Sequence, residues 1–208
     1  MVIFFYKLHL LNKYHFLYYC KVKIFSKLRS SYGEKYLIKK SKNLIRNKHV
    51  HNFQTAKTLG ILFDAGIPDS LKLVREFGKY LSDQQISCSY LGYVNSEEIS
   101  SNLLFHDHIN IFCKKDLDFF YRPTNPDALA FMAKKFDMLI DLNLTAHYPA
   151  KYISSLSPAV FKVGKFTKDD IDLDLMIDIH SKPDVEYLIE QIKYYVSILN
   201  NPNATIKH

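Results

Sequence analysis

The regular alternation of short apolar runs with amphipathic segments after residue 57 constrains the fold more than any other feature of this sequence. Strands that alternate with helices pair in parallel, because each helix carries the chain back across a face of the sheet. The pattern predicts an α/β fold of Rossmann-like or flavodoxin-like type. We expect a mainly parallel sheet of about six strands, helices on both of its faces, and a basic helical arm before it. The order of the strands stays open.

Apolar runs of strand length and segments with helical spacing define the expected elements of this domain. The strands are expected at residues 58–65, 86–94, 108–113, 136–143, 159–164 and 173–179. The helices are expected at residues 68–83, 127–136, 147–157 and 183–200. Proline followed by aspartate opens the first and the last of these helices, which is a typical helix-start signal.

Charge divides the sequence into two parts, which we interpret as an arm of residues 1–57 and an α/β domain of residues 58–208. The arm holds 13 Lys or Arg and one acidic residue, a net charge of +12, whereas the domain holds 15 against 20, a net charge of −5. Residues 25–48 have helical spacing that Gly33 is expected to interrupt, and residues 49–57 are expected to form a linker. A basic arm favours contact with a polyanion, and the alternative is a solvated face.

The basic residues of the arm are the candidates for that contact. They are Lys21, Lys23, Lys27, Arg29, Lys39, Lys40, Lys42, Arg46 and Lys48. Such residues neutralise phosphates and give binding that weakens with salt and does not depend on base sequence. Tyr32 and Tyr36 either stack on unpaired bases or dock the arm onto the domain. The expected partner is RNA, the ribosome or an anionic membrane surface, and the sequence indicates no particular protein partner.

The first 21 residues are apolar but are interrupted by lysines. They contain no run of about 20 uncharged apolar residues, so neither a membrane span nor a signal peptide is expected. Either an interfacial helix or a misassigned start codon would explain this segment. The three cysteines, Cys20, Cys88 and Cys113, show no disulfide or metal spacing and fit a reducing compartment. We therefore expect a cytoplasmic protein, with peripheral attachment to the membrane as the alternative.

Three of the expected strands end in aspartate, namely Asp64, Asp141 and Asp178. Open α/β sheets bind ligands outside the carboxyl ends of their strands, so these residues are candidates for catalysis. Neighbouring carboxylates could hold Mg²⁺, or one of them could act as a general base. The alternative is structural, because aspartate at a strand end accepts hydrogen bonds from loop N–H groups. The candidates for ligand binding at the same edge are Asn143, Lys162 and Gly164.

No established catalytic or cofactor motif is present in the sequence. The glycine-rich loops that hold phosphates are missing, and the chain has only six glycines. His106, Asp107 and His108 look like a metal-binding triplet, but no further ligand stands at a suitable spacing, so we favour a surface turn. Neither a cofactor nor a metal site is therefore predicted.

Several motifs in the second half of the chain occur in a characteristic order: FDMLIDLN, AKYISSLSPAVFKVGKF and DLMIDI, followed by the helix YLIEQIKYYVSIL. Together with the first strand GILFDA and the basic N-terminal helix, they resemble an uncharacterised family of Bacteroidetes proteins, classed as a domain of unknown function, over residues 53–199. The resemblance implies no known activity, cofactor or catalytic residue. FDMLIDLN and ISSLSPAVFKVG are also similar, more weakly, to the acceptor-side half of heptosyltransferase-type glycosyltransferases, which implies a shared fold and not glycosyl transfer.

Three functional hypotheses follow from these observations. The first is a non-enzymatic binding module whose basic arm contacts RNA or another polyanion. The second is a small α/β enzyme that uses the aspartates at the strand ends, with Mg²⁺ as a candidate metal. The third is a protein attached to a membrane through residues 1–21. We favour the first, because the charge division is strong and no catalytic signature is present.

Overall fold

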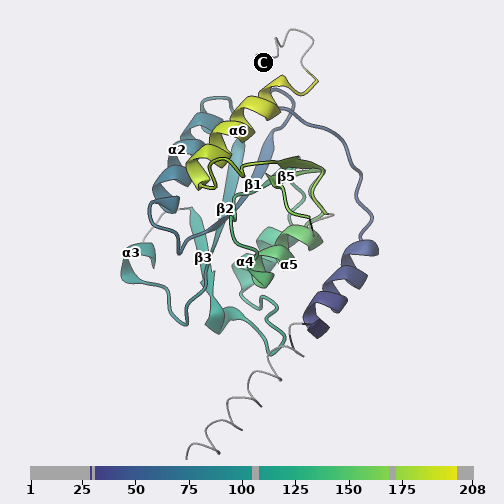
Figure 1. Cartoon of the computed structure of the whole chain (residues 1–208), viewed down its shortest axis with the longest axis vertical. Coiled ribbons are helices and arrows are strands. Elements are labelled where there is room, and N and C mark those ends of the chain that lie inside the picture. The colour runs from purple at the N-terminus through teal and green to yellow at the C-terminus, as the bar shows by residue number, and fades with distance from the viewer. Residues whose placement is uncertain (1–28, 30, 105–107, 169–171, 201–208) are drawn as a thin grey trace, which may run out of the picture.

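The computed structural model describes residue 29 and residues 31–104, 108–168 and 172–200, and these residues contain a six-stranded sheet (Figure 1). The strands are β1 (Thr58–Asp64), β2 (Ser87–Val94), β3 (Ile109–Cys113), β4 (Met138–Asp141), β5 (Phe161–Lys165) and β6 (Leu175–Ile177). Neighbouring strands all pair in parallel, in the order β3-β2-β1-β4-β5-β6. This is the strand order of a Rossmann fold, so the predicted α/β class is confirmed.

Helices cover both faces of the sheet, as the sequence predicted (Figure 1). The helices on one face are α2 (Ser70–Ser82) and α6 (Val185–Ile198), and those on the other face are α4 (Pro126–Ala133) and α5 (Tyr148–Leu156). Two short elements that the sequence did not indicate are α3 (Ser101–Leu104) and the 3₁₀ turn η1 (Lys114–Asp116).

The apolar stripes of these helices form two separate layers of core. On one face α2 packs Val74, Phe77 and Leu81 against the sheet, and on the other face α5 contributes Ala150 and Ile153. β1 contributes to both layers, and all of its residues after the first are buried. A strand that is apolar on both sides belongs in the middle of a parallel sheet, which is where β1 lies.

The register of the central strands sets which side chains meet at the carboxyl edge of the sheet. Leu62 of β1 pairs with Asp141 of β4, and Asp64 pairs with Tyr93 of β2. Side chains alternate between faces along a strand, so Asp64, Leu62 and Asp141 all point to the face covered by α4 and α5. The aspartates that end β1 and β4 therefore lie on the same side of the sheet.

Residues 31–42 form a helix that packs against the start of α5 (Figure 1). Leu37 is only 2% exposed, and the Tyr148 hydroxyl donates a hydrogen bond of 2.9 Å to the Gly33 carbonyl oxygen. A Cβ atom on Gly33 would come within 3.0 Å of the Tyr148 ring. Glycine therefore allows the two helices to approach closely, and it does not interrupt the helix as the sequence suggested.

The chain between this helix and β1 runs along the domain with an irregular backbone. Helical spacing predicted a helix as far as residue 48, but the helix ends at residue 42. The Asn52 side-chain amide donates to the Leu199 carbonyl oxygen at 2.8 Å, and Phe53 is buried in the core layer of α2 and α6. Inside the predicted helix, Arg46 binds Asp174 and the Ala159 carbonyl group, and these tertiary contacts outweigh the weak local preference for a helix.

The remaining predicted elements are present, with bounds that differ by a few residues. β4 begins at Met138, and Asp137 just before it accepts the N–H groups of Lys57 and Thr58 with its carboxylate at 2.8 and 2.9 Å. No helix in the parts of the chain that the structure describes combines the length and the hydrophobicity needed to cross a membrane.

Candidate functional site

The winding of the chain reverses between β1 and β4, in the middle of the carboxyl edge of the sheet. β1 leads into α2 on one face, whereas β4 leads into α5 on the other face. The loops that leave these strands therefore separate, and open α/β sheets bind ligands in the crevice that results. Asp64 and Asp141 end the two strands, which is where the sequence placed them.

Asp64 is buried and is held by two contacts. Its Oδ1 atom accepts the Gly66 N–H at 2.8 Å, and its Oδ2 atom lies 3.2 Å from Nε2 of His147. His147 directly precedes α5, and the centre of its ring lies 5.6 Å from that of Tyr93. Burial, with the charges of Cys113 and Asp64 next in weight, raises the pKa of Tyr93 to about 12, so this phenol is protonated at neutral pH. The contact between Asp64 and His147 ties the loop before α5 to the end of β1.

Asp141 holds the first turn after β4 through Asn143. The Oδ1 atom of Asp141 accepts the backbone N–H of Asn143 at 3.0 Å and its side-chain amide N–H at 2.7 Å. The Oδ1 atom of Asn143 is buried and has no hydrogen-bond partner. An unpaired buried acceptor costs about 1–3 kcal/mol, so this oxygen is a candidate contact for a hydrogen-bond donor on a ligand.

A cleft of about 770 Å³ lies between the helix of residues 31–42 and the loop from β4 to α5. Asn143 and His147 line this cleft. Its charged lining residues are Lys42, Lys151 and Lys165 together with Glu34, Asp141 and Asp172. The Lys165 ammonium donates a hydrogen bond to the Leu144 carbonyl oxygen, which fixes this lysine at the end of β5. Charges of both signs make the cleft a mixed polar site.

A smaller hollow of about 440 Å³ lies beyond His147 and Tyr148, which line both spaces. Arg29, a candidate for polyanion binding, lines this hollow. Its guanidinium carbon lies 4.4 Å from the ring centre of Phe119 and 4.2 Å from that of Tyr121. Phe119 is 63% exposed, and the hollow also contains Lys114, Glu97 and Asp118, so Arg29 lies in a surface of mixed charge with exposed aromatic rings.

The helix of residues 31–42 turns several lysines away from the domain. Gly33 and Leu37 occupy its buried side, whereas Lys35, Lys39 and Lys40 are exposed. We call these three exposed lysines the basic face. The sequence predicted Lys39 and Lys40 as part of such a surface and did not single out Lys35.

The two tyrosines of this helix take different positions. Tyr32 is 56% exposed, and its ring centre lies 4.9 Å from that of Phe120. Tyr36 is partly covered, because Lys40 Nζ and the Arg122 guanidinium carbon lie 5.7 and 5.2 Å from its ring centre. Tyr32 is therefore accessible for stacking, whereas Tyr36 helps to dock the helix onto the domain.

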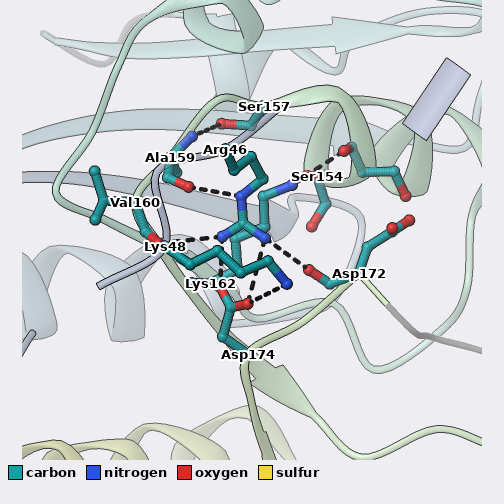
Figure 2. Close-up of polar contacts among 10 residues, drawn as sticks. Arg46, Lys48, Ser154, Ser157, Ala159, Val160, Lys162, Asp172 and Asp174 are labelled. Atoms are coloured by element: carbon teal, nitrogen blue, oxygen red, sulfur yellow. Dashed lines mark hydrogen bonds and ion pairs between the residues drawn. The ribbon is translucent and has the colours of Figure 1, made fainter. Parts of the chain in front are cut away.

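Arg46 is buried, although the sequence placed it among the candidates for polyanion binding (Figure 2). Its guanidinium forms an ion pair with the Asp174 carboxylate and donates to three backbone carbonyl oxygens. Those carbonyl groups belong to Ala159, Val160 and Asp172. Each guanidinium nitrogen is thus bonded within the protein, so Arg46 does not present itself to an external phosphate.

Asp174 also binds Lys48, another of the candidates, with 3.0 Å between Nζ and Oδ1 (Figure 2). The Lys48 side chain is 60% exposed, in contrast to that of Arg46. Burial raises the pKa of Asp174, but the hydrogen bonds from Arg46 and Lys48 outweigh burial and hold this pKa below its usual value. The carboxylate therefore stays charged at neutral pH and fastens residues 46–48 to the domain.

Lys162 is fully buried and binds the C-terminal end of α5 (Figure 2). Its ammonium donates to the carbonyl oxygens of Ser154 at 2.6 Å and Ser155 at 3.0 Å. Carbonyl groups at a helix C-terminus attract a cation. Burial, followed by the charge of Arg46, nevertheless lowers the pKa of Lys162 to about 7. This predicted ligand-binding residue joins α5 to β5 and does not line the cleft.

Two further candidates lie at the β4–β6 side of the sheet. Gly164 pairs with Asp141, and a Cβ atom there would come within 3.1 Å of the Asp141 carbonyl oxygen, so glycine lets the strands approach closely. Asp178 follows the edge strand β6, is exposed, and lies 2.7 Å from Nδ1 of His180. Hydrogen bonds from the His180 backbone and ring lower the pKa of Asp178.

The structure does not bring the three strand-end aspartates together as one metal site. Asp64 and Asp141 end adjacent strands, whereas two strand pairings separate Asp141 from the strand that Asp178 follows. Among the described residues, no group of three or more His, Cys, Asp or Glu is placed to hold a metal ion. His108 is exposed in a turn with a φ of 66°. Five residues that the sequence analysis considered lie outside the described residues: Lys21, Lys23, Lys27, His106 and Asp107.

Sequence reasoning missed several residues that complete the cleft, above all His147, Lys151 and Lys165. His147 stands directly before the Tyr-Pro pair that opens α5, and this position at a helix start was a readable signal. The two lysines carried no such signal, because they line one cleft only when α5, β5 and the helix of residues 31–42 are packed together.

Comparison with known proteins identifies one family. A family of unknown function, DUF6913, matches residues 29–199, a range that includes the docked helix as well as the whole sheet. No curated protein and no solved structure matches the chain. The weaker likeness to glycosyltransferases therefore stays a prediction. The expected membership in a family of unknown function is confirmed, and the chain belongs to DUF6913.

Proposed function

We propose that this protein is a binding module that contacts single-stranded RNA through the basic face of the helix of residues 31–42. The main support for this proposal is the way in which the helix docks onto the domain. Gly33 and Leu37 are buried against the domain, so the docked helix keeps Lys35, Lys39 and Lys40 exposed to solvent. Lysines on such a surface neutralise the phosphates of a nucleic acid.

Exposed aromatic rings beside the basic face favour an unpaired strand over a duplex. Tyr32 is 56% exposed and Phe119 is 63% exposed, and both of their rings contact Phe120. Stacking of an unpaired base on an aromatic side chain contributes about 1–3 kcal/mol. Bases in a duplex stack on one another and offer no such face, so lysines next to accessible rings fit single-stranded RNA.

The proposal includes a cytoplasmic location, where RNA, free or on the ribosome, is abundant. Cys88 and Cys113 are free thiols, which fits a reducing compartment. The alternative of membrane attachment rests on residues 1–21, which lie outside the described residues. An anionic membrane would also attract the basic face, so the test below compares RNA with anionic vesicles.

Charge reversal on the basic face tests the proposal. Fluorescence anisotropy with a labelled oligouridine strand measures the affinity of the full chain at several salt concentrations. We expect the triple variant Lys35→Glu/Lys39→Glu/Lys40→Glu to bind at least about tenfold more weakly. Its affinity should also depend less steeply on salt, because each lost phosphate contact removes about 0.7 from the slope of log K against log salt.

A matched control changes three exposed lysines on other elements, Lys72→Glu/Lys79→Glu/Lys135→Glu. The control carries the same net charge as the basic-face variant and should bind the strand as the wild type does. Tyr32→Ala should weaken binding without changing the salt slope, because the ring contributes stacking and no charge. Equal losses in the two triple variants, or tighter binding to anionic vesicles than to RNA, would contradict the proposal.

A further inference from the structure

The cleft beside the helix of residues 31–42 is a second candidate site, and none of the three lysines of the basic face lines it. It is lined by the loop from β4 to α5, by the end of β5 and by the edge of the helix. Its volume of about 770 Å³ lies within the range of about 300–1,000 Å³ that is usual for small-molecule sites. It lies beside the point where the winding of the sheet reverses, the place where sheets of this order bind ligands.

Cationic groups converge on this cleft from three elements. Lys42 belongs to the N-terminal helix, Lys151 to α5 and Lys165 to β5. The N-terminus of α5 also faces the cleft, and its N-cap residue, His147, forms no side-chain cap. Lysines and uncapped helix N–H groups together favour a compact anion, and phosphate accepts hydrogen bonds from both.

The other lining groups indicate a ligand that is more than an anion. The buried Oδ1 atom of Asn143 lacks a hydrogen-bond partner and accepts only from a donor such as a hydroxyl group. Glu34 and Asp172 add acceptors, while Ser41 and Thr145 add hydroxyl groups. Acidic side chains oppose the entry of a bare polyanion, so the lining suits a phosphate ester that also carries hydroxyl groups.

We propose that this cleft binds a ribonucleotide. The phosphate lies against Lys42, Lys151 and Lys165, and a ribose hydroxyl donates to the Oδ1 atom of Asn143. The base occupies the remaining part of the cleft, beside the apolar surface of Leu37 and Ile38. The protein therefore has two candidate sites along one helix, a cleft for a nucleotide and an exposed surface for RNA.

Calorimetric titration of the full chain with AMP, GMP, CMP and UMP tests the inference. We expect at least one of them to bind at least about tenfold more tightly than both its nucleoside and inorganic phosphate. The 2′,3′-dideoxy form of that nucleotide should bind about tenfold more weakly to the wild type, because it lacks the hydroxyl groups that donate to Asn143. Asn143→Ala should bind the two forms almost equally, which separates this contact from a general loss of folding.

Lysine variants complete the test. Lys151→Met should weaken nucleotide binding by about tenfold or more, whereas the matched variant Lys72→Met on α2 should leave it unchanged. The basic-face variant Lys35→Glu/Lys39→Glu/Lys40→Glu should keep nucleotide binding, so the two proposals can fail separately. The inference is overturned if no ribonucleotide binds more tightly than inorganic phosphate, or if Lys151→Met and Lys72→Met bind equally.

Discussion

Arg46 and Lys48 are two residues apart and both contact Asp174, but their burial differs greatly. Arg46→Met would leave the largely covered Asp174 carboxylate, whose side chain is 13% exposed, with only the exposed Lys48 and one backbone N–H as partners. We expect this change to lower the free energy of unfolding by about 3–5 kcal/mol. Lys48→Met should lower it by less than about 1 kcal/mol, because its ammonium is solvated. Urea denaturation measures both values, and similar losses would contradict this assignment.

Lys162 makes the stability of the protein depend on pH. Burial, with the charge of Arg46 next in weight, lowers its pKa from 10.5 to about 7. Between these values the unfolded chain binds a proton that the folded protein does not, so stability rises with pH through this window. From about pH 6.5 to about pH 8.5, we expect the free energy of unfolding to rise by about 2 kcal/mol more in the wild type than in Lys162→Met.

Urea denaturation of both proteins across this range measures that difference. A constant difference would show that the carbonyl groups of Ser154 and Ser155 keep the Lys162 ammonium charged despite its burial. Below about pH 6 the lysine is protonated in both the folded and the unfolded state, so no further change from this group is expected there.

At the scale of elements, the docking of the helix of residues 31–42 depends on a glycine contact. Gly33→Leu would place a side chain where Tyr148 now lies 3.0 Å from the expected Cβ position. We expect the helix to separate from α5 and expose Leu37, whose burial contributes about 2 kcal/mol. Hydrogen exchange in residues 31–42 should then be at least about tenfold faster, with the sheet unchanged.

The control for this helix is Ser31→Leu, which adds the same side chain at an exposed position. It should leave the exchange rates of residues 31–42 close to those of the wild type. Equal acceleration in both variants would mean that the added leucine, and not the lost contact with Tyr148, disturbs the helix.

Most of the helices and strands could be predicted from local sequence patterns. Buried strands such as β1 and β4 are short apolar runs, and α2 and α6 have helical spacing after a helix-start signal. The helix of residues 25–48 was predicted too long at its C-terminal end, because Arg46 owes its position to distant partners such as Asp174 and Ala159. The strand-end residues Asp64 and Asp141 were also found, since strand ends are visible in an apolar pattern.

At the scale of the whole molecule, the position of a residue along the chain says little about the charges around it. Arg46 and Lys40 belong to one basic stretch of sequence, but one is buried with Asp174 and the other lies on the basic face. The high charge of residues 1–57 therefore has two uses in the described part of this segment. Some of its cations fasten the segment to the acidic domain, and others remain available to a partner.

The sequence by itself determined the α/β class, most of the helices and strands, and the charge division. These properties follow from local periodicity and composition, which neighbouring residues carry. Only the tertiary structure decided the strand order, the burial of Arg46 and Lys162, and the cleft that joins Asn143, His147 and Lys165. Each of these requires contacts between segments far apart in the chain, and the free energy of such contacts depends on the packed fold and not on any local pattern.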